Sequence, residues 1–223
     1  MPAAQNNSII FVIIKYAFEV SPTIKDMAGF LRDSGFSVDI LTDKYYRDKN
    51  FSISGINIIS MEDNPGKDEL FYSSLLKNYR YIFAVDYLAL SFLERTGVQL
   101  SNVIYLSFES TQYMLKEPKE KSLGLLNKCK LGIMQSKERL NDFKDYFDNK
   151  LDLGFEYLPV SMRPVKTSAE KNSACIIYSG YLAEWSGMLE FVKLFTASRY
   201  RGFFELRIQG HAMGTDYYLK ALQ

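Results

Sequence analysis

Two glycines late in the sequence stand where a strand-like pattern gives way to a loop. Gly180 closes the apolar run that begins at Ala174, and Gly210 closes the run that begins at Phe203. A glycine at the carboxyl end of a parallel strand lets the backbone approach an anion, and a helix that begins beyond it directs free N–H groups to the same place. The alternative is an ordinary strand-to-helix turn in which Gly180 serves only the chain reversal. We therefore expect an anion-binding edge with these candidate residues: Gly180, Tyr181, Ser186, Gly187, Gly210 and His211.

In the first half of the chain, four side chains with polar groups also stand just past strand-like runs: Tyr16, Tyr45, Asp86 and Glu109. Tyr16 and Tyr45 are candidates for the wall of a ligand pocket. Asp86 is suited either to orienting a ligand hydroxyl or to capping the helix that follows it. Glu109 is suited to contacting ligand hydroxyls, or else to a helix-capping or ion-paired role.

The sequence offers little for a metal ion or an organic cofactor. His211 is the only histidine, Cys129 and Cys175 belong to no CxxC motif, and no Asp-x-Asp motif occurs. The chain also lacks G-x-G-x-x-G, the fingerprint of dinucleotide-binding folds. We expect no metal and no cofactor, and we interpret both cysteines as reduced thiols in the core.

A regular alternation of strands and helices must position these residues. Short apolar runs, typical of strands buried on both faces, occur at 8–14, 37–42, 56–60, 80–86, 102–107 and 131–136. Helical patterns lie at 21–35, 67–78, 87–96, 119–128 and 137–146. In the first of these, Ser21 can cap the helix, Pro22 suits its first position and Gly35 suits its end. Residues 1–160 are therefore predicted to form a Rossmann-like α/β domain, a doubly wound parallel sheet.

A polar stretch over residues 161–173 separates this domain from a second one. The strand–loop–helix cycle restarts at residue 174, continues through 203–210 and ends in a helical pattern at 214–222. Two strands do not make a stable doubly wound sheet alone. We therefore expect residues 174–223 to be an incomplete second Rossmann-like domain that needs more chain or a large docking surface.

The net charge and the hydropathy of the chain limit which partners and which place in the cell we expect. A formal net charge of +1 gives no electrostatic footprint for nucleic acid. The apolar run at 9–14 is too short to span a bilayer, and it lacks the flanks of a signal peptide. We predict a cytoplasmic protein, and leave open a peripheral contact with the inner membrane face and a homo-oligomeric state.

Five stretches, taken in order, resemble a known family: residues 21–42, LGIMQSKERL at 131–140, FEYLPVSM at 155–162, IIYSGYLAEWSGMLEFVKLF at 176–195 and ELRIQGHAMGTDYYLKAL at 205–222. In this order they resemble the GT-B glycosyltransferases, in particular their retaining, family-4-like group. The resemblance implies two Rossmann-like domains, the second of them cut short within the donor-binding half.

The resemblance also implies roles for the candidate residues. The second unit would bind the diphosphate of a nucleotide sugar, the first would bind an acceptor through Tyr16, Tyr45 and Asp86, and Glu109 would be the catalytic carboxylate. Relatives usually carry an arginine and a lysine where this chain has Tyr181 and Ser186. Each lost charge-assisted hydrogen bond is worth roughly 1.5–3 kcal/mol, so donor binding is expected to be weakened. Phe108 likewise replaces a histidine that relatives carry before the glutamate.

The resulting hypothesis is a glycosyltransferase that transfers a sugar from a nucleotide-sugar donor to a glycan or lipid-linked acceptor, in polysaccharide or surface glycan biosynthesis. Because half of the donor site is expected to be missing, the 223-residue chain should show little activity alone. Two alternatives stay open: a non-catalytic GT-B-like partner or scaffold subunit, and a sugar-nucleotide 2-epimerase.

Overall fold

The chain folds into two compact units, Met1–Pro164 and Val165–Gln223. The computed structural model describes residues 7–45, 48–108, 117–158, 174–182 and 187–212. The predicted linker at 161–173 and the predicted helix at 214–222 lie outside these ranges, so both stay predictions.

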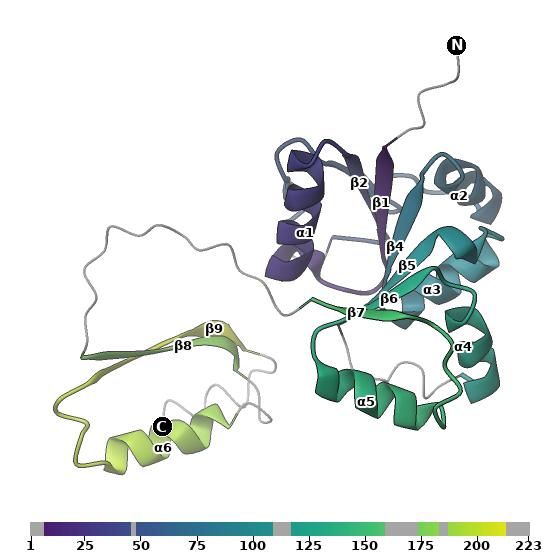
Figure 1. Cartoon of the computed structure of the whole chain (residues 1–223). Helices are drawn as coiled ribbons and strands as arrows, with labels where there is room; N and C mark the ends of the chain where they lie inside the picture. Colours follow the sequence, from purple (N-terminus) through teal and green to yellow (C-terminus); the bar gives the residue numbers. More distant parts are fainter. Residues whose placement is uncertain (1–6, 46–47, 109–116, 159–173, 183–186, 213–223) are drawn as a thin grey trace. The chain divides into compact units, whose positions relative to one another are not determined.

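The first unit is a parallel sheet with helices on both faces (Figure 1). Its strands are β1 (Ser8–Ile13), β2 (Ser37–Thr42), β3 (Asn57–Ser60), β4 (Tyr81–Val85), β5 (Val103–Ser107), β6 (Leu131–Met134) and β7 (Phe155–Tyr157). They lie in the order β3-β2-β1-β4-β5-β6-β7, and every neighbouring pair is parallel. The predicted Rossmann-like doubly wound fold is confirmed.

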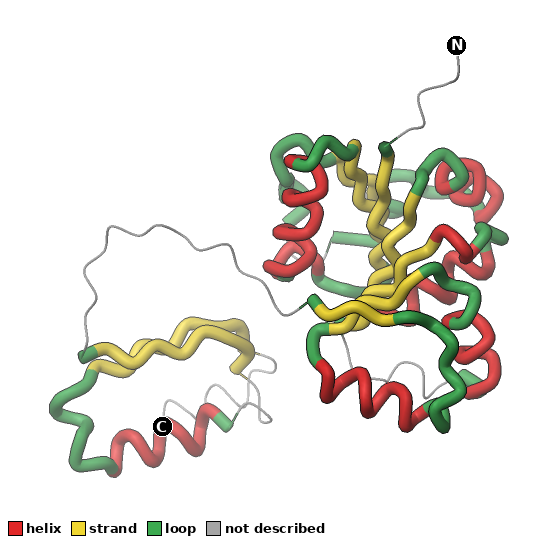
Figure 2. The backbone as a smooth tube through the Cα atoms, viewed as in Figure 1, coloured by secondary structure: helices red, strands yellow, loops and turns green. Residues whose placement is uncertain are grey.

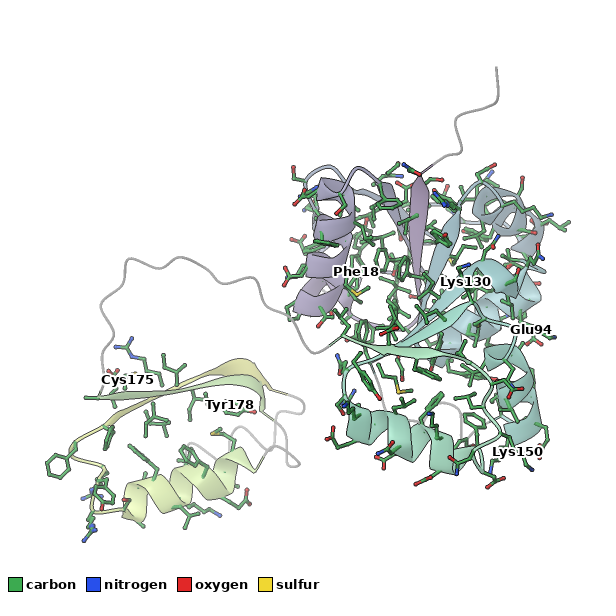
Figure 3. The ribbon with its side chains drawn as sticks, viewed as in Figure 1. Phe18, Glu94, Lys130, Lys150, Cys175 and Tyr178 are labelled. Carbon is green, nitrogen blue, oxygen red and sulfur yellow. The ribbon has the colours of Figure 1, made fainter. Side chains whose placement is uncertain are left out.

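The helices of this unit divide between the two faces of the sheet. The α-helices are α1 (Pro22–Asp33), α2 (Glu69–Leu76), α3 (Asp86–Arg95), α4 (Lys119–Leu126) and α5 (Lys137–Tyr146), and two short 3-10 turns are η1 (Phe18–Val20) and η2 (Leu100–Asn102). Residues of α1 pack in one apolar cluster with Ile9, Phe11 and Ile13 of β1. Residues of α2 to α5 pack in another cluster with Ile10 and Val12. Alternate side chains of β1 thus enter opposite cores. Figure 3 draws the side chains of the unit and labels Phe18, which belongs to the α1-side core.

Local signals explain where α1 begins and ends. The Ser21 hydroxyl accepts a hydrogen bond from the Ile24 N–H at 3.4 Å, and Pro22 opens the helix. Gly35 has a φ of +90°, a conformation that L side chains rarely adopt, directly after the last turn. All three predicted capping residues are confirmed.

Close packing between β6 and β7 leaves no room for a side chain at Gly132. A Cβ added there would overlap the ring of Phe155, its register partner on β7. That ring packs edge-on against Phe143 with centroids 5.9 Å apart, so it has little freedom to move away.

We therefore expect Gly132→Ala to lower the free energy of unfolding by about 1–3 kcal/mol, the usual cost of overpacking. Urea denaturation followed by circular dichroism measures the change. Gly154→Ala is the matched control, because a Cβ there meets nothing within 4 Å. Equal stability of the two variants would contradict the packing argument.

The second unit is a strand–helix–strand unit in its described part: β8 (Cys175–Leu182), α6 (Met188–Ala197) and β9 (Glu205–Ala212) (Figure 2). The two strands are parallel. Met188 is buried, but many apolar side chains of this unit are exposed, among them Ile177, Leu194 and Phe203. The expectation of a small unit with too little core of its own agrees with this exposure.

The strands of the second unit extend further than the sequence indicated. Gly180 and Gly210 were predicted to end the strands, but β8 and β9 continue to Leu182 and Ala212. The prediction was wrong because the ladder between the strands carries two more residue pairs beyond the glycines. The prediction that both cysteines are core thiols is correct for Cys129, which is buried, whereas Cys175 is only half-buried.

No described helix in either unit is both long enough and apolar enough to cross a membrane.

Candidate functional site

The strand order of the first unit reverses between β1 and β4. Beyond β1 the chain continues to α1 on one face, and beyond β4 it enters α3 on the other. Such a point opens a crevice at the carboxyl edge of a parallel sheet, where ligands of open α/β folds bind. Two non-glycine residues at this edge have left-handed backbones, Lys15 with φ +55° and Asp86 with φ +60°.

Asp86 is the residue that ties this edge together. It is buried, and its Oδ1 accepts a hydrogen bond from the Phe108 N–H at 2.8 Å. This bond links the end of β4 to the residue that follows β5. The alternative role as helix cap is not what the structure shows, because Val85 holds the cap position of α3.

Both backbone polar groups of Phe108 form hydrogen bonds with side chains. Its carbonyl oxygen accepts a hydrogen bond from Arg139 Nη1 at 2.6 Å, and the same nitrogen donates to Gln135 Oε1 at 2.8 Å. The buried Phe108 ring lies 6.4 Å from the ring of Tyr16, centroid to centroid. The structure therefore brings Tyr16, Asp86 and Phe108 together. Glu109 comes next in the chain but lies outside the described residues.

Sequence reasoning missed Arg139, although the sequence holds a signal. Arg139 is the third residue of α5, whose cap is Ser136. A cation in the first turn of a helix faces the positive end of the helix dipole, which disfavours it. Such a placement points to a specific partner, and the partner found here is the carbonyl of Phe108.

Tyr45 lies on the other side of β1, at the β2 end of the edge. It is half-buried against the α1-side core. Burial raises the pKa of its hydroxyl, and the carboxylates of Asp63 and Glu19 raise this pKa further. Nearby, the Lys15 N–H donates to Asp43 Oδ1 at 3.1 Å. Tyr45 thus packs against the same apolar cluster as Tyr16 and Phe108 and also lies near carboxylates. Glu19 and Asp43 were not among the site residues expected from the sequence.

A pair of glycines lies near the carboxyl edge of the second unit. Gly180 pairs with Gly210, and Tyr181 pairs with His211, in the parallel ladder. Two glycines side by side leave a strip of sheet without side chains, which suits close approach of a ligand. Ser186 lies outside the described residues, as do the side-chain positions of Tyr181 and His211.

Gly187 begins the helix of this edge. It has a φ of +63° and holds the cap position of α6 without any side-chain hydrogen bond to the helix. The amino end of this 10-residue helix therefore begins at a glycine that follows a parallel strand, and the positive end of a helix dipole favours anions.

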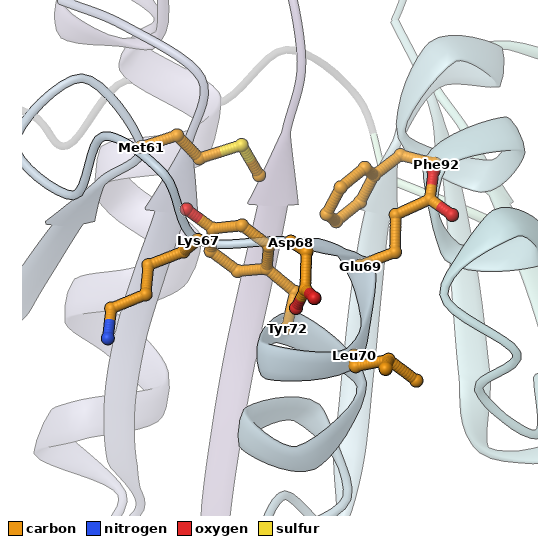
Figure 4. A pocket seen from close by; sticks show the side chains of 7 residues that line it. All are labelled: Met61, Lys67, Asp68, Glu69, Leu70, Tyr72 and Phe92. Atoms are coloured by element: carbon orange, nitrogen blue, oxygen red, sulfur yellow. The ribbon is translucent and has the colours of Figure 1, made fainter.

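A hollow of about 600 Å³ lies elsewhere, at the start of α2 (Figure 4). Met61, Tyr72 and Phe92 contribute apolar walls. The two carboxylates at its rim already have partners within the protein. Asp68 accepts a hydrogen bond from the Phe71 N–H at 2.9 Å, and Glu69 forms an ion pair with Arg95 at 3.2 Å. No candidate from the sequence lines it, so we locate the candidate site at the strand ends.

Comparison with known proteins gives the fold. No protein-family model matches the sequence, and no curated protein matches it. A solved structure described as "Trehalose-6-phosphate from E. coli bound with UDP-2-fluoro glucose" is similar, with a TM-score of 0.59 over 96% of this chain and 67% of that chain. The chain has a GT-B fold. The sequence identity is 13%, so the likeness shows the fold alone.

The GT-B fold confirms what the five ordered stretches led us to expect of the architecture. It leaves the candidate residues as predictions, and the same holds for the expected absence of a metal. Among the described residues, no three His, Cys, Asp or Glu side chains gather into a group that could hold a metal ion.

Proposed function

We propose that this chain is a glycosyltransferase that moves a sugar from a nucleotide-sugar donor to a glycan or lipid-linked acceptor, in polysaccharide or surface glycan biosynthesis. The observation that carries the proposal is the edge of the second unit. There the glycine pair Gly180–Gly210 and the start of α6 at Gly187 occur in one unit of a GT-B fold.

In this proposal the second unit binds the diphosphate. The glycine pair lets the diphosphate approach the backbone closely, and the positive end of the α6 dipole attracts it. The similar solved structure was determined with UDP-2-fluoro glucose bound, which supports a nucleotide sugar as the ligand. When the bond from the anomeric carbon to the diphosphate breaks, negative charge grows on the diphosphate, and the dipole of α6 stabilises this charge.

The first unit is proposed to bind the acceptor at its carboxyl edge, through Tyr16, Tyr45 and Asp86. An acceptor hydroxyl oxygen forms the new bond to the anomeric carbon, and Glu109 accepts its proton. Asp86 and Arg139 support this role indirectly, because they fix the backbone of Phe108, the residue just before Glu109.

A second candidate is a non-catalytic GT-B-like subunit. It is favoured by one specific observation: Tyr181 and Ser186 stand where the resembling family has cations, so the diphosphate is offered N–H groups without matching charge. A helix terminus contributes only about 0.3–1 kcal/mol, less than a charged side chain.

Calorimetry with UDP and with GDP tests the proposal. We expect measurable binding to the full chain, and at least a tenfold loss in Gly187→Asp. Aspartate and asparagine tolerate a positive φ better than other side chains, so both variants carry a similar backbone strain at Gly187, and only the negative charge of aspartate opposes the diphosphate. Gly187→Asn is therefore the matched control, and it should lose less affinity than Gly187→Asp.

Absence of nucleotide binding by the unmodified chain would favour the non-catalytic subunit. Where binding is found, incubation with UDP-, GDP- and ADP-sugars plus candidate acceptors separates the remaining cases. A new glycoside together with free nucleotide indicates a transferase, whereas an isomerised sugar nucleotide indicates a 2-epimerase.

A further inference from the structure

The turn between α6 and β9 carries aromatic side chains that no core accounts for. Tyr200 is 49% exposed and Phe203 is 72% exposed, and Phe204 is exposed next to them. The turn joins the end of α6 to the start of β9, at one end of the strand layer and the helix layer of this unit (Figure 2). We call residues 199–204 the aromatic turn.

The backbone of the aromatic turn is held by its own hydrogen bonds. The Phe203 N–H donates to the Tyr200 carbonyl at 2.9 Å, and the Tyr200 N–H donates to Ser198 Oγ at 3.1 Å. Arg201 Nη1 donates to the Thr196 carbonyl at 3.2 Å, at the end of α6. The rings are therefore presented by an already ordered segment, and binding through them costs little ordering entropy.

Basic side chains flank these rings in the sequence. The segment from Lys193 to Arg207 contains four basic side chains and one acidic one, Glu205. Arg207 binds that carboxylate with two hydrogen bonds, at 2.8 and 3.0 Å. Arg199 and Arg201 thus give the aromatic turn itself two positive charges, and residues 199–204 contain no acidic residue.

Arg199 and Tyr200 form a compact polar and aromatic pair. The guanidinium carbon lies 4.8 Å from the centre of the Tyr200 ring, and Arg199 Nη2 donates to the tyrosine hydroxyl at 2.6 Å. A tyrosine with an apolar ring and a polar end is the type of residue that is enriched at the level of lipid headgroups. Phe203 adds a fully apolar ring three residues further on.

We propose that the aromatic turn binds the surface of an anionic lipid bilayer. Phe203 and Tyr200 enter the headgroup region, and Arg199 and Arg201 bind lipid phosphates. The exposed aromatic rings can bury apolar area in the headgroup region, and the positive charge of the turn attracts anionic lipids. The inference is independent of the proposed function.

The aromatic turn and the glycine pair lie at opposite ends of β9, so membrane binding through the turn would leave the proposed nucleotide site accessible. The turn lies at the amino end of β9, whereas Gly210 lies near the carboxyl end of that strand (Figure 1). Glu205 and Gly210 are five positions apart along the strand, a length of roughly 16 Å at about 3.3 Å per residue. A bilayer that touches the turn leaves the glycine pair in water.

Vesicle flotation of the full chain tests the inference. We expect binding to phosphatidylcholine vesicles that contain about one third phosphatidylglycerol, little binding to pure phosphatidylcholine, and weakening by salt. Phe203→Ser should lower the partition coefficient about tenfold, because a buried phenyl group is lost. Arg199→Gln and Arg201→Gln should each lower it about fivefold. Leu70→Ser is the matched control: Leu70 is 79% exposed in the first unit, and its loss should change nothing.

Circular dichroism of each variant confirms that it is folded, since all four side chains are exposed or lie on a turn. Failure of the unmodified chain to float with anionic vesicles overturns the inference, and so does equal flotation of Phe203→Ser. Concentration-dependent self-association that Phe203→Ser abolishes, without flotation, would show instead that the turn contacts a second copy of the chain.

Discussion

Asp86→Ala is expected to lower the free energy of unfolding by about 3 kcal/mol, because the side chain performs two structural tasks. Its carboxylate accepts the Phe108 N–H in a buried setting, and a hydrogen bond to a charged group is worth about 1.5–3 kcal/mol. Its backbone has a φ of +60°, a conformation that aspartate, asparagine and glycine tolerate better than alanine, by about 1 kcal/mol.

Two further substitutions separate these tasks. Asp86→Gly keeps the backbone freedom and loses the acceptor, so it should cost less than Asp86→Ala by about 1 kcal/mol. Asp86→Asn keeps both an acceptor oxygen and the tolerance for positive φ, and should cost about 1 kcal/mol or less. Urea denaturation gives the ranking Ala, Gly, Asn in decreasing damage.

Hydrogen exchange supplies a local measurement. The Phe108 amide should lose protection in Asp86→Ala and Asp86→Gly but keep most of it in Asp86→Asn. An alanine variant as stable as the unmodified protein, or a Phe108 amide that exchanges equally in all variants, would show that this bond does not hold the edge of the sheet.

Much of the first unit could be predicted because its signals are local. Near-continuous apolar runs marked the strands, and the sequence around α1 contained the cap Ser21, the proline at the first position and the terminal glycine. Each of these acts over one turn of chain, so a single sequence carries it.

The features that the sequence did not give depend on pairing between distant segments. Arg139 acquires its role only when α5 lies beside the end of β5, 31 residues earlier in the chain. The sequence predicts that a strand ends at Gly180, because glycine weakens strands. In the structure, pairing with β9 extends β8 to Leu182. The carboxyl edge was predicted correctly as the location of Tyr16 and Asp86, whereas their contacts to Phe108 were not.

Alkaline pH is expected to destabilise the first unit through a single buried thiol. Cys129 is 9% exposed, and burial raises the pKa of its thiol to about 12. In the unfolded chain the thiol titrates near its ordinary value of about 8.5. Between these pH values the unfolded chain has released a proton that the folded protein still holds. Stability is therefore lost as pH rises, by up to about 1.4 kcal/mol per pH unit.

Comparison with Cys129→Ser isolates this effect. Serine keeps the size and can still donate to the Leu125 carbonyl, which the thiol approaches at 3.5 Å, but it does not ionise in this range. Burial also raises the pKa of Tyr79 and of Tyr105. The contribution of Tyr79 cancels between the two proteins, and that of Tyr105 cancels except for the smaller part of its rise that comes from Cys129. Between about pH 9 and pH 10.5 the unmodified protein should lose roughly 2 kcal/mol more than the variant.

Alkylation provides a second measurement, best made in a Cys175→Ser background where Cys129 is the remaining thiol. Only the thiolate reacts, so iodoacetamide should modify the native protein far more slowly at pH 9 than it modifies the urea-unfolded protein. Parallel pH–stability curves for the unmodified protein and Cys129→Ser, or native alkylation at the unfolded rate, would mean that Cys129 is not enclosed by the α2–α5 core. Because Cys129 lies directly after α4 and before β6, such a result would also place that junction outside the core that holds β5 and β6 in register.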